Sequence, residues 1–564
     1  MATYSNAEAF IEVLNAHGVE KIFFNPGGEF IGLQSRIAQA RVAGEKAPQL
    51  VLCLDESVTV SAAHGAYMVS GKPQVILVHS ELGTLQMGGN LQNLQWGRVR
   101  AVILAAYQTD GLRSTWRQEP YDQGWIVRGN MKWDRRITND EGLGPILTEA
   151  FRVACTEPTG PVYLYFPFDY LAQSTDKPAA SPIPAEVAPL PPADTGALDQ
   201  AADLLLAANN PLIVTGTAGR YPQNVDALVR LAESLCAPVL TGQVWMNFPT
   251  DHPLCLGIEQ IGGSRKPNPG IAEADVILAI DYDMPYVGGD GMPAPTAKIV
   301  HIDVDPLTNG RLLWERGADL FIEADSREAV PALERLLRQR VDSEKRHDLQ
   351  ERFRLLEAAH QETRRGWRAL ARSHESREPI SPDWLCYCVN QLIDDETVLV
   401  HHTLSHCASA TEQIERTKPG TLLGCPAGAI GWAMGASLGA KMAAPGKTVV
   451  TLLTDGGFVW GCPTSTLWTA VKYGASFLAV IFNNQGYGVV RGSQKQILGV
   501  DSLAEEYTFE AGVEFMPDYA MIARACGAYG LTVEDPAEVL PALEEGLARV
   551  RAGQAAVLDV RLGR

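Results

Sequence analysis

The part of the chain that most restricts the possible folds is segment 447–488, with the sequence KTVVTLLTDGGFVWGCPTSTLWTAVKYGASFLAVIFNNQGYG. It contains an apolar run that ends at Asp455, a stretch of helical composition, and a second apolar run that ends at Asn484. This order predicts a βαβ unit, in which two parallel strands place their carboxyl ends side by side. We therefore expect Asp455 and Asn484 in one crevice at the edge of a parallel sheet, where open α/β sheets bind ligands.

The residues at these two strand ends predict a particular kind of ligand. Asp455 offers a carboxylate, Asn484 offers an amide oxygen, and Gly456 and Gly486 leave the backbone uncovered. Oxygen ligands of this kind suit a hard divalent cation, and bare backbone suits phosphate groups. The pattern therefore indicates a cofactor that carries a diphosphate.

The chain divides into three blocks. Block 1–175 alternates short apolar runs with helical stretches, block 195–340 repeats this pattern, and block 380–564 contains the βαβ segment. A proline-rich linker separates the first two blocks, and a charged helical connector separates the last two. Alternation of this kind predicts parallel sheets covered by helices. The expected fold class is α/β, with three Rossmann-like domains.

Composition excludes several classes of partner. The net charge of −19 disfavours nucleic acid and anionic membrane surfaces, because both attract positive patches. No apolar run approaches the roughly 20 residues that cross a bilayer. The ten cysteines form no CxxC pair, as expected for reduced thiols in a cytoplasmic protein.

The motif at Asp455-Gly456 followed by Asn484 resembles the binding motif of thiamine diphosphate enzymes, the superfamily that includes acetohydroxyacid synthase, pyruvate oxidase, benzaldehyde lyase and 2-oxo acid decarboxylases. The resemblance covers essentially the whole chain and implies pyrimidine-binding, central and diphosphate-binding domains in that order. It implies that Asp455, Asn484 and the Gly486 carbonyl bind Mg²⁺, and that Gly456 and Gly457 lie at the cofactor. The chain departs from the motif at Thr454, where the family usually has glycine.

Glu56 is the second residue that the resemblance singles out. It follows the apolar run QLVLCLDE, at the position where the family has a glutamate against the aminopyrimidine ring. A carboxyl group in a dry crevice can share a proton with a ring nitrogen. The alternative is that Asp55-Glu56 only caps a helix, since acidic residues favour helix N-termini. Together with the diphosphate motif, the resemblance favours the catalytic interpretation.

Other residues of the first block are weaker candidates. The loop FFNPGGEF resembles the family's glycine-rich loop, so Glu29 is either an acid/base group in the pocket or an exposed turn residue. The segment WRQEPYDQG resembles the loop with a catalytic glutamine in acetohydroxyacid synthases, which indicates Gln118. Glu81 or Gln86 is a further candidate for the pocket wall.

The third block contributes the remaining predicted contacts. The segment CPAGAIGWAMGASLGAK resembles the helix over the thiazolium ring, with Gly428 free to meet the aminopyrimidine and Ile430 between the two rings. The string at His402-Thr403 lies where relatives contact the diphosphate. His401, His402 and His406 also allow a zinc site as an alternative. No G-x-G-x-x-G follows a strand of the central block, so we expect no FAD there.

The expected function is ThDP- and Mg²⁺-dependent cleavage or formation of a C–C bond next to a carbonyl, as in acetolactate synthase-like enzymes. The substrate class is a 2-oxo acid, an aldehyde or a hydroxy ketone. Alternatives are 2-hydroxyacyl-coenzyme A lyase or benzaldehyde lyase-like activity, or a weakly catalytic protein with a regulatory role. Family geometry implies a homodimer or homotetramer whose active sites lie between subunits.

Overall fold

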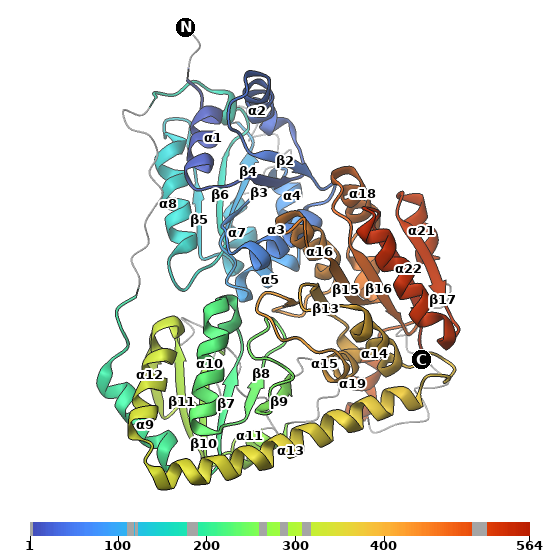
Figure 1. Ribbon diagram of the computed structural model, residues 1–564. Helices are drawn as coiled ribbons and strands as arrows, with labels where there is room; N and C mark the ends of the chain where they lie inside the picture. Colours follow the sequence, from blue (N-terminus) through green and yellow to red (C-terminus); the bar gives the residue numbers. More distant parts are fainter. Residues whose placement is uncertain are drawn as a thin grey trace.

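The structure is a computed structural model, which describes residues 4–109, 118, 122–177, 190–258, 268–282, 292–306, 317–498 and 516–563. The strands of this part of the chain form three six-stranded sheets, in which all pairing is parallel. The predicted class of three parallel α/β domains is confirmed. Each sheet takes its strands from one predicted block. In Figure 1 the first domain lies at the top, the central domain at the lower left and the third at the right.

The first sheet has the strand order β2-β1-β3-β4-β6-β5. Its short strands are apolar because both faces of a parallel sheet are covered; β3, for example, is buried along its whole length. The strands are β1 (Lys21–Phe24), β2 (Gln49–Leu52), β3 (Gln74–Leu77), β4 (Ala101–Tyr107), β5 (Trp133–Arg136) and β6 (Val162–Pro167). The helices are α1 (Asn6–Ala16), α2 (Ile31–Ala43), α3 (Glu56–Ser70), α4 (Ser80–Gln86), α5 (Asn90–Trp96), α7 (Gln123–Val127) and α8 (Leu143–Cys155).

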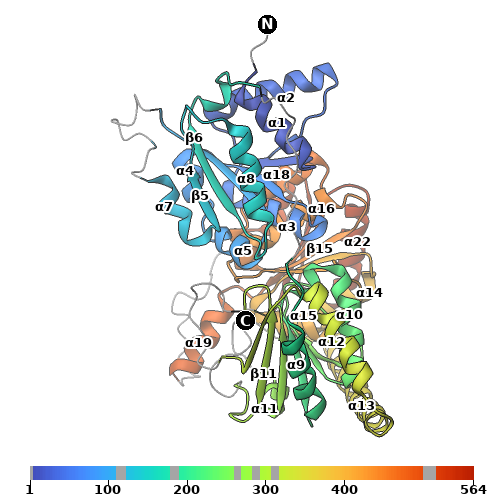
Figure 2. The same cartoon turned by 90° about the vertical axis from the view of Figure 1, so that its left-hand side faces the viewer.

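The central sheet has the order β12-β11-β10-β7-β8-β9. Helices α9, α10 and α12 pack together beside it (Figure 2). The strands are β7 (Pro211–Thr215), β8 (Val239–Thr241), β9 (Cys255–Ile258), β10 (Val276–Ile280), β11 (Lys298–Asp303) and β12 (Leu320–Glu323). The helices are α9 (Thr195–Ala207), α10 (Pro222–Leu235), α11 (Pro269–Glu273) and α12 (Ser326–Arg340).

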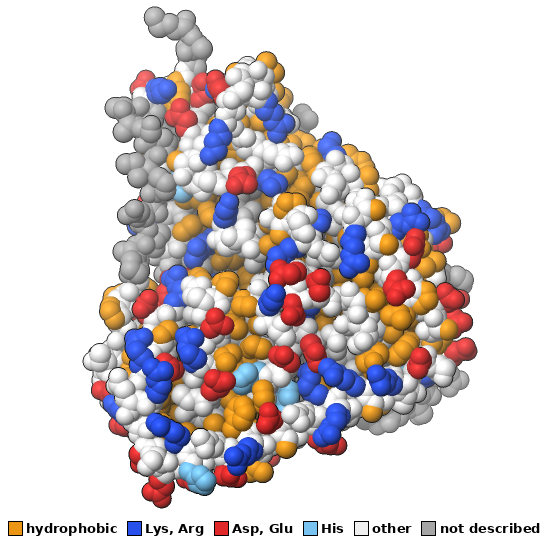
Figure 3. All heavy atoms as spheres, in the orientation of Figure 1, with side chains coloured by type: hydrophobic (Ala, Val, Ile, Leu, Met, Phe, Trp, Pro, Cys, Tyr) orange, Lys and Arg blue, Asp and Glu red, His pale blue; other side chains and the backbone are white. Residues whose placement is uncertain are grey.

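The charged connector is one long helix, α13 (Ser343–Ser373), which runs from the central domain to the third domain (Figure 1). Only Leu349 and Ala371 of this helix are buried. Acidic and basic side chains are mixed with apolar ones along the lower edge of the molecule, where α13 runs (Figure 3). Among the described residues, no helix combines the length and the apolar character that a membrane crossing requires.

The third sheet has the order β14-β13-β15-β16-β18-β17. Its strands are β13 (Val398–His402), β14 (Leu422–Gly424), β15 (Val449–Thr454), β16 (Leu478–Asn483), β17 (Tyr529–Val533) and β18 (Ala556–Arg561). Its helices are α14 (Pro382–Leu392), α15 (Cys407–Gln413), α16 (Trp432–Ala443), α17 (Asp455–Trp460), α18 (Pro463–Tyr473), α19 (Gly488–Leu498), α21 (Tyr519–Ala525) and α22 (Val539–Arg551).

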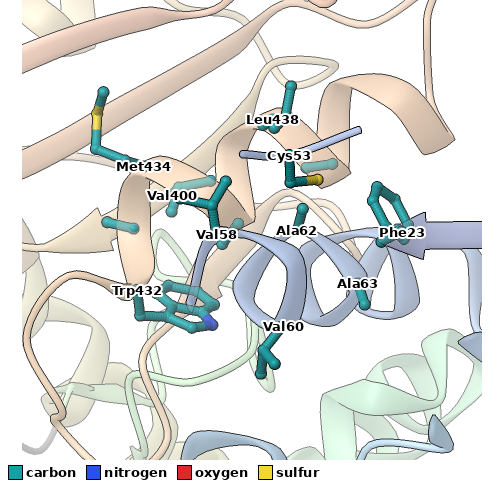
Figure 4. Packing of buried hydrophobic residues seen from close by; sticks show 14 of the residues in the cluster. Phe23, Cys53, Val58, Val60, Ala62, Ala63, Val400, Trp432, Met434 and Leu438 are labelled. Atoms are coloured by element: carbon teal, nitrogen blue, oxygen red, sulfur yellow. The ribbon is translucent and has the colours of Figure 1, made fainter. Parts of the chain in front are cut away.

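The first and third domains meet where α3 crosses α16. The crossing is close because glycines face backbone atoms: a Cβ at Gly65 would overlap the Ala436 carbonyl, and one at Gly439 would overlap the Ala62 carbonyl. Apolar side chains of both helices surround the crossing, with Val58 on α3 and Trp432 and Leu438 on α16 (Figure 4). The helix that begins at Glu56 is therefore fixed against the helix that follows Gly428.

Candidate active site

The carboxyl end of β13 is the switch point of the third sheet. Strand β13 pairs with β14 on one side and with β15 on the other. The sheet therefore grows in one direction from β13 to β14 and in the opposite direction from β13 to β15. Open α/β sheets bind ligands at such a point. Strand β13 ends at His402, while Asp455 and Asn484 directly follow β15 and β16.

Asp455 and Gly486 lie together at this edge, as the βαβ pattern predicts. The Asp455 carboxylate is buried and accepts hydrogen bonds from the backbone N–H of Gly456 at 2.7 Å and of Gly486 at 3.1 Å. Burial raises the pKa of Asp455, against the opposing effect of these N–H groups. Asn484 is also buried and directly follows β16, the strand that pairs with β15. The Gly486 carbonyl accepts from Gly488 N–H at 3.1 Å and keeps a second lone pair.

Thr454 has a structural role that explains why glycine is not needed there. Its backbone is extended, with φ −82° and ψ 165°, so no left-handed conformation is required. Its hydroxyl accepts a hydrogen bond from Gly457 N–H at 3.0 Å and caps α17. The N–H groups of Gly456 and Gly457, two predicted cofactor contacts, are thus both used within the chain. The departure from the motif replaces bare backbone with a helix cap.

Polar atoms without partners gather at the end of β13. Nδ1 of His401, Nε2 of His406 and the Thr403 hydroxyl are buried and find no hydrogen-bond partner among the described residues, whereas the buried His402 ring contacts the backbone of Gly428. Burial lowers the pKa of all three histidines to about 4, so they are neutral at pH 7. Buried polar groups are normally paired, which indicates that this crevice receives a polar ligand. Within the described residues, no three His, Cys, Asp or Glu side chains converge on a metal-binding point, so geometry lends no support to the zinc alternative.

The loop before α16 lies close to this edge. Gly428 has φ +72°, and a Cβ there would meet no atom within 4 Å. Gly431 has φ +94°, and a Cβ there would overlap the Trp460 carbonyl, so only glycine fits. Ile430 is half-buried. The space beside Gly428 is therefore open, and Ile430 lies two residues further along the same loop.

Glu56 is the first residue of α3, and its environment separates it from the capping role. Asp55 is the N-cap, because its side chain accepts from the N–H groups of Ser57 and Val58. Glu56 is only 6% exposed, and burial raises its pKa, against smaller opposing effects of Asn25 and its own backbone. The capping interpretation thus applies to Asp55, and Glu56 is a buried carboxyl group at the edge of the first sheet.

His79 is a site residue that sequence reasoning missed. Its Nδ1 lies 2.9 Å from the Glu29 carboxylate, which also accepts from Ser80 N–H at 3.0 Å. Glu29 is 2% exposed, so the exposed-turn alternative for it is wrong. Hydrogen bonding to Glu29 raises the pKa of His79, and the negative charge of Glu56 adds to the shift. Three ionisable groups therefore meet at one edge of the first sheet. The one signal in the sequence is a histidine directly after an apolar strand.

The remaining candidates of the first domain are Gln118, Gln86 and Glu81. Gln118 is half-buried with φ +53°, while its neighbours 110–117 and 119–121 lie outside the described residues. Gln86 is exposed and donates to Asp55 at 3.2 Å. Glu81 is half-buried. Among the described residues, no hydrogen bond or ion pair joins Glu56, Glu29 or His79 at the first sheet to Asp455 or Asn484 at the third.

Comparison with known proteins agrees with this geometry. Three family models match in order: the thiamine pyrophosphate enzyme N-terminal TPP binding domain over 5–125, the central domain over 198–333 and the C-terminal TPP binding domain over 405–560. The chain belongs to the thiamine pyrophosphate enzyme family.

Relatives in this family have different activities. The acetolactate synthase isozyme 3 large subunit of Escherichia coli is 25% identical, over 99% of this chain and 95% of its own. The sulfoacetaldehyde acetyltransferase of Castellaniella defragrans is 26% identical, over 96% and 90% respectively. The structure of the thiamine diphosphate-dependent 4-hydroxybenzoylformate decarboxylase of Rhodococcus jostii superposes with a TM-score of 0.82 at 21% identity, covering 99% of both chains. The last likeness shows the fold alone.

The residues present fit the cofactor of the thiamine pyrophosphate enzyme family. Its diphosphate needs hydrogen-bond donors, which the unpaired Thr403 hydroxyl and the nearby His402 ring offer. A cation between phosphate and protein needs oxygen ligands, which Asp455, Asn484 and the Gly486 carbonyl offer. The open face at Gly428 leaves space beside the loop.

Proposed function

We propose that this chain is a thiamine diphosphate- and Mg²⁺-dependent enzyme that breaks or forms a C–C bond next to the carbonyl of a 2-oxo acid or a related aldehyde or hydroxy ketone. The observation that carries the proposal is the buried Asp455 carboxylate, oriented by two backbone N–H groups at a switch point with unpaired polar side chains. Burial of a carboxylate is costly, and a divalent cation would offset that cost.

The roles of the chain's own residues follow from their environments. When bound, the cofactor supplies an electron sink for the bond that breaks. Burial raises the pKa of Glu56, which favours the protonated carboxyl group that can share its proton with a ring nitrogen. His79, held by Glu29 and with 24% of its side chain exposed, can donate a proton to a reacting oxygen or carbon.

An assembly of two or four copies is part of the proposal. Glu56 lies at the first sheet and Asp455 at the third sheet. In this family's geometry a second copy of the chain would complete each site. Large apolar side chains are exposed on α4 and α17: Leu82 by 51%, Leu85 by 54%, Val459 by 48% and Trp460 by 62%. Apolar side chains grouped in this way favour an interface. Light scattering after size exclusion tests this, and an active monomer would contradict it.

The regulatory alternative has lost one of its reasons. A departure from the family motif such as Thr454 would favour a weakly catalytic protein, but the Thr454 hydroxyl caps α17 without distorting the backbone. The acid, the amide and the glutamate that the family uses are all retained at buried positions. We therefore favour an active enzyme.

The test is turnover of the purified chain with thiamine diphosphate and Mg²⁺ on pyruvate and benzoylformate, measured as CO₂ release and carboligation product. Glu56→Gln should lower kcat by about 10²–10⁴-fold, the usual contribution of acid–base catalysis. The matched control is Glu149→Gln, which changes a half-buried glutamate on α8 that pairs with Arg152. Full activity of Glu56→Gln, or no turnover on any carbonyl substrate by a protein that binds the cofactor, would contradict the proposal.

A further inference from the structure

The side chain of Asn93 on α5 is completely buried against the loop 425–430 of the third domain. Its Oδ1 accepts from Ala427 N–H at 3.3 Å and from the Cys425 thiol at 3.1 Å. Its Nδ2 donates to the Ala429 carbonyl at 3.4 Å. One amide from the first domain thus bonds to three successive parts of the loop that presents Gly428 and Ile430.

The same amide is tied to the start of α3. Nδ2 of Asn93 also donates to Oδ1 of Asn90 at 3.1 Å, and Nδ2 of Asn90 donates to the Ser57 carbonyl at 3.2 Å. Ser57 directly follows Glu56. A continuous hydrogen-bond chain therefore runs from the first turn of the helix that begins at Glu56 to the loop of the third domain.

Hydrogen bonds from outside the loop matter because glycine gives its backbone many accessible conformations. Gly428 and Gly431 both have left-handed φ values, and glycine loses the most conformational freedom on ordering. The Cys425 thiol adds a weak contact to the Ala429 carbonyl at 3.6 Å, within the loop itself. The bonds from Asn93 are the part of this bracing that comes from another domain, and a buried amide keeps its geometry because unpaired polar atoms there are costly.

We propose that Asn93, supported by Asn90, is a positioning residue that fixes the loop 425–430 in the conformation that receives the aminopyrimidine–thiazolium end of the cofactor. The inference rests on the proposed function, because the ligand of the loop is the cofactor proposed there. The diphosphate end is held by other residues, after β13, β15 and β16. Loss of Asn93 should therefore weaken binding of the whole cofactor and spare binding of a diphosphate alone.

The experiment compares two ligands by calorimetry on the full chain: thiamine diphosphate with Mg²⁺, and inorganic diphosphate with Mg²⁺. Asn93→Ala should raise the Kd for thiamine diphosphate about tenfold, the effect of losing one to two net hydrogen bonds. The Kd for inorganic diphosphate should stay within about twofold, since only the loop end is disturbed. Asn130→Ala is the matched control, because it removes an amide of the first domain that bonds to Gln95 at 3.1 Å and not to the loop.

Each outcome has one meaning. An unchanged thiamine diphosphate affinity, or an equal loss for both ligands, would overturn the positioning role. If Asn93→Ala does not fold, Asn93→Asp replaces it, since aspartate keeps the acceptor for Ala427 and loses the amide donor. A threefold or larger loss of affinity for thiamine diphosphate alone supports the role. The absence of a selective loss of affinity overturns it. If the unaltered protein binds no thiamine diphosphate, the proposed function itself fails. If it binds the cofactor and Asn93→Ala binds it equally well, only the role of Asn93 fails.

Discussion

Replacing Gly439 with alanine should destabilise the contact between the first and third domains. A Cβ at Gly439 would overlap the backbone of Ala62, far inside the 3.0 Å limit that real Cβ contacts keep. Relief requires a shift of α3 against α16, because backbone atoms cannot rotate away as a side chain can. Overpacking of this kind costs about 1–3 kcal/mol, and the greater helix propensity of alanine returns at most about 1 kcal/mol. The direct overlap with the Ala62 carbonyl oxygen places the cost at the upper end of that range, so the expected net loss is about 2 kcal/mol.

Gly366 is the matched control for this substitution. It lies in the middle of α13, is exposed, and a Cβ there would meet no atom within 4 Å. Gly366→Ala should therefore be neutral or stabilising, by up to about 1 kcal/mol. Urea unfolding followed by tryptophan fluorescence compares the midpoints of the two variants, because a chain of three domains does not justify a single extrapolated free energy. Equal midpoints for Gly439→Ala and Gly366→Ala would refute the close crossing of α3 and α16.

Two further changes test local features of the site. Glu29 raises the pKa of His79. Protonated His79 should therefore persist at pH values above those at which a free histidine loses its proton, and it should be lost as pH rises through the raised pKa. Glu29→Gln should therefore move the alkaline limb of the kcat/KM profile to lower pH, and an unmoved limb would argue against the pair. Thr454→Ala removes the cap of α17 and should cost about 1 kcal/mol, whereas Thr454→Gly should cost only a few tenths. Thermal unfolding of the two variants checks this order, and the reverse order would show that the cap is unimportant.

The sequence predicted the parts of the site that depend on strand order. Asp455 and Asn484 each follow an apolar run, and neighbouring parallel strands bring such residues to one edge whatever the details of packing. The three-domain fold followed from the same alternation of strands and helices. Both predictions use only short-range patterns, which can be recognised in a single sequence.

The parts that were missed depend on contacts between distant segments. His79 becomes distinctive only because Glu29, from the loop after β1, lies against it. Thr454 looked like a departure from a motif, and only the geometry of α17 gives its hydroxyl a purpose. Asn93 lies on a short polar helix, where nothing in the sequence distinguishes it from a solvated asparagine. Tertiary contacts assigned all three roles.

The central claim is that Asp455 holds a magnesium ion that carries the cofactor. Calorimetric titration of chelator-treated protein with thiamine diphosphate, with and without added Mg²⁺, tests it most directly when repeated on Asp455→Ala. We expect binding that depends on Mg²⁺ and weakens about a hundredfold or more in the variant, equivalent to about 2.7 kcal/mol. An affinity that ignores both Mg²⁺ and the loss of Asp455, or no binding by the unaltered protein, would contradict the claim.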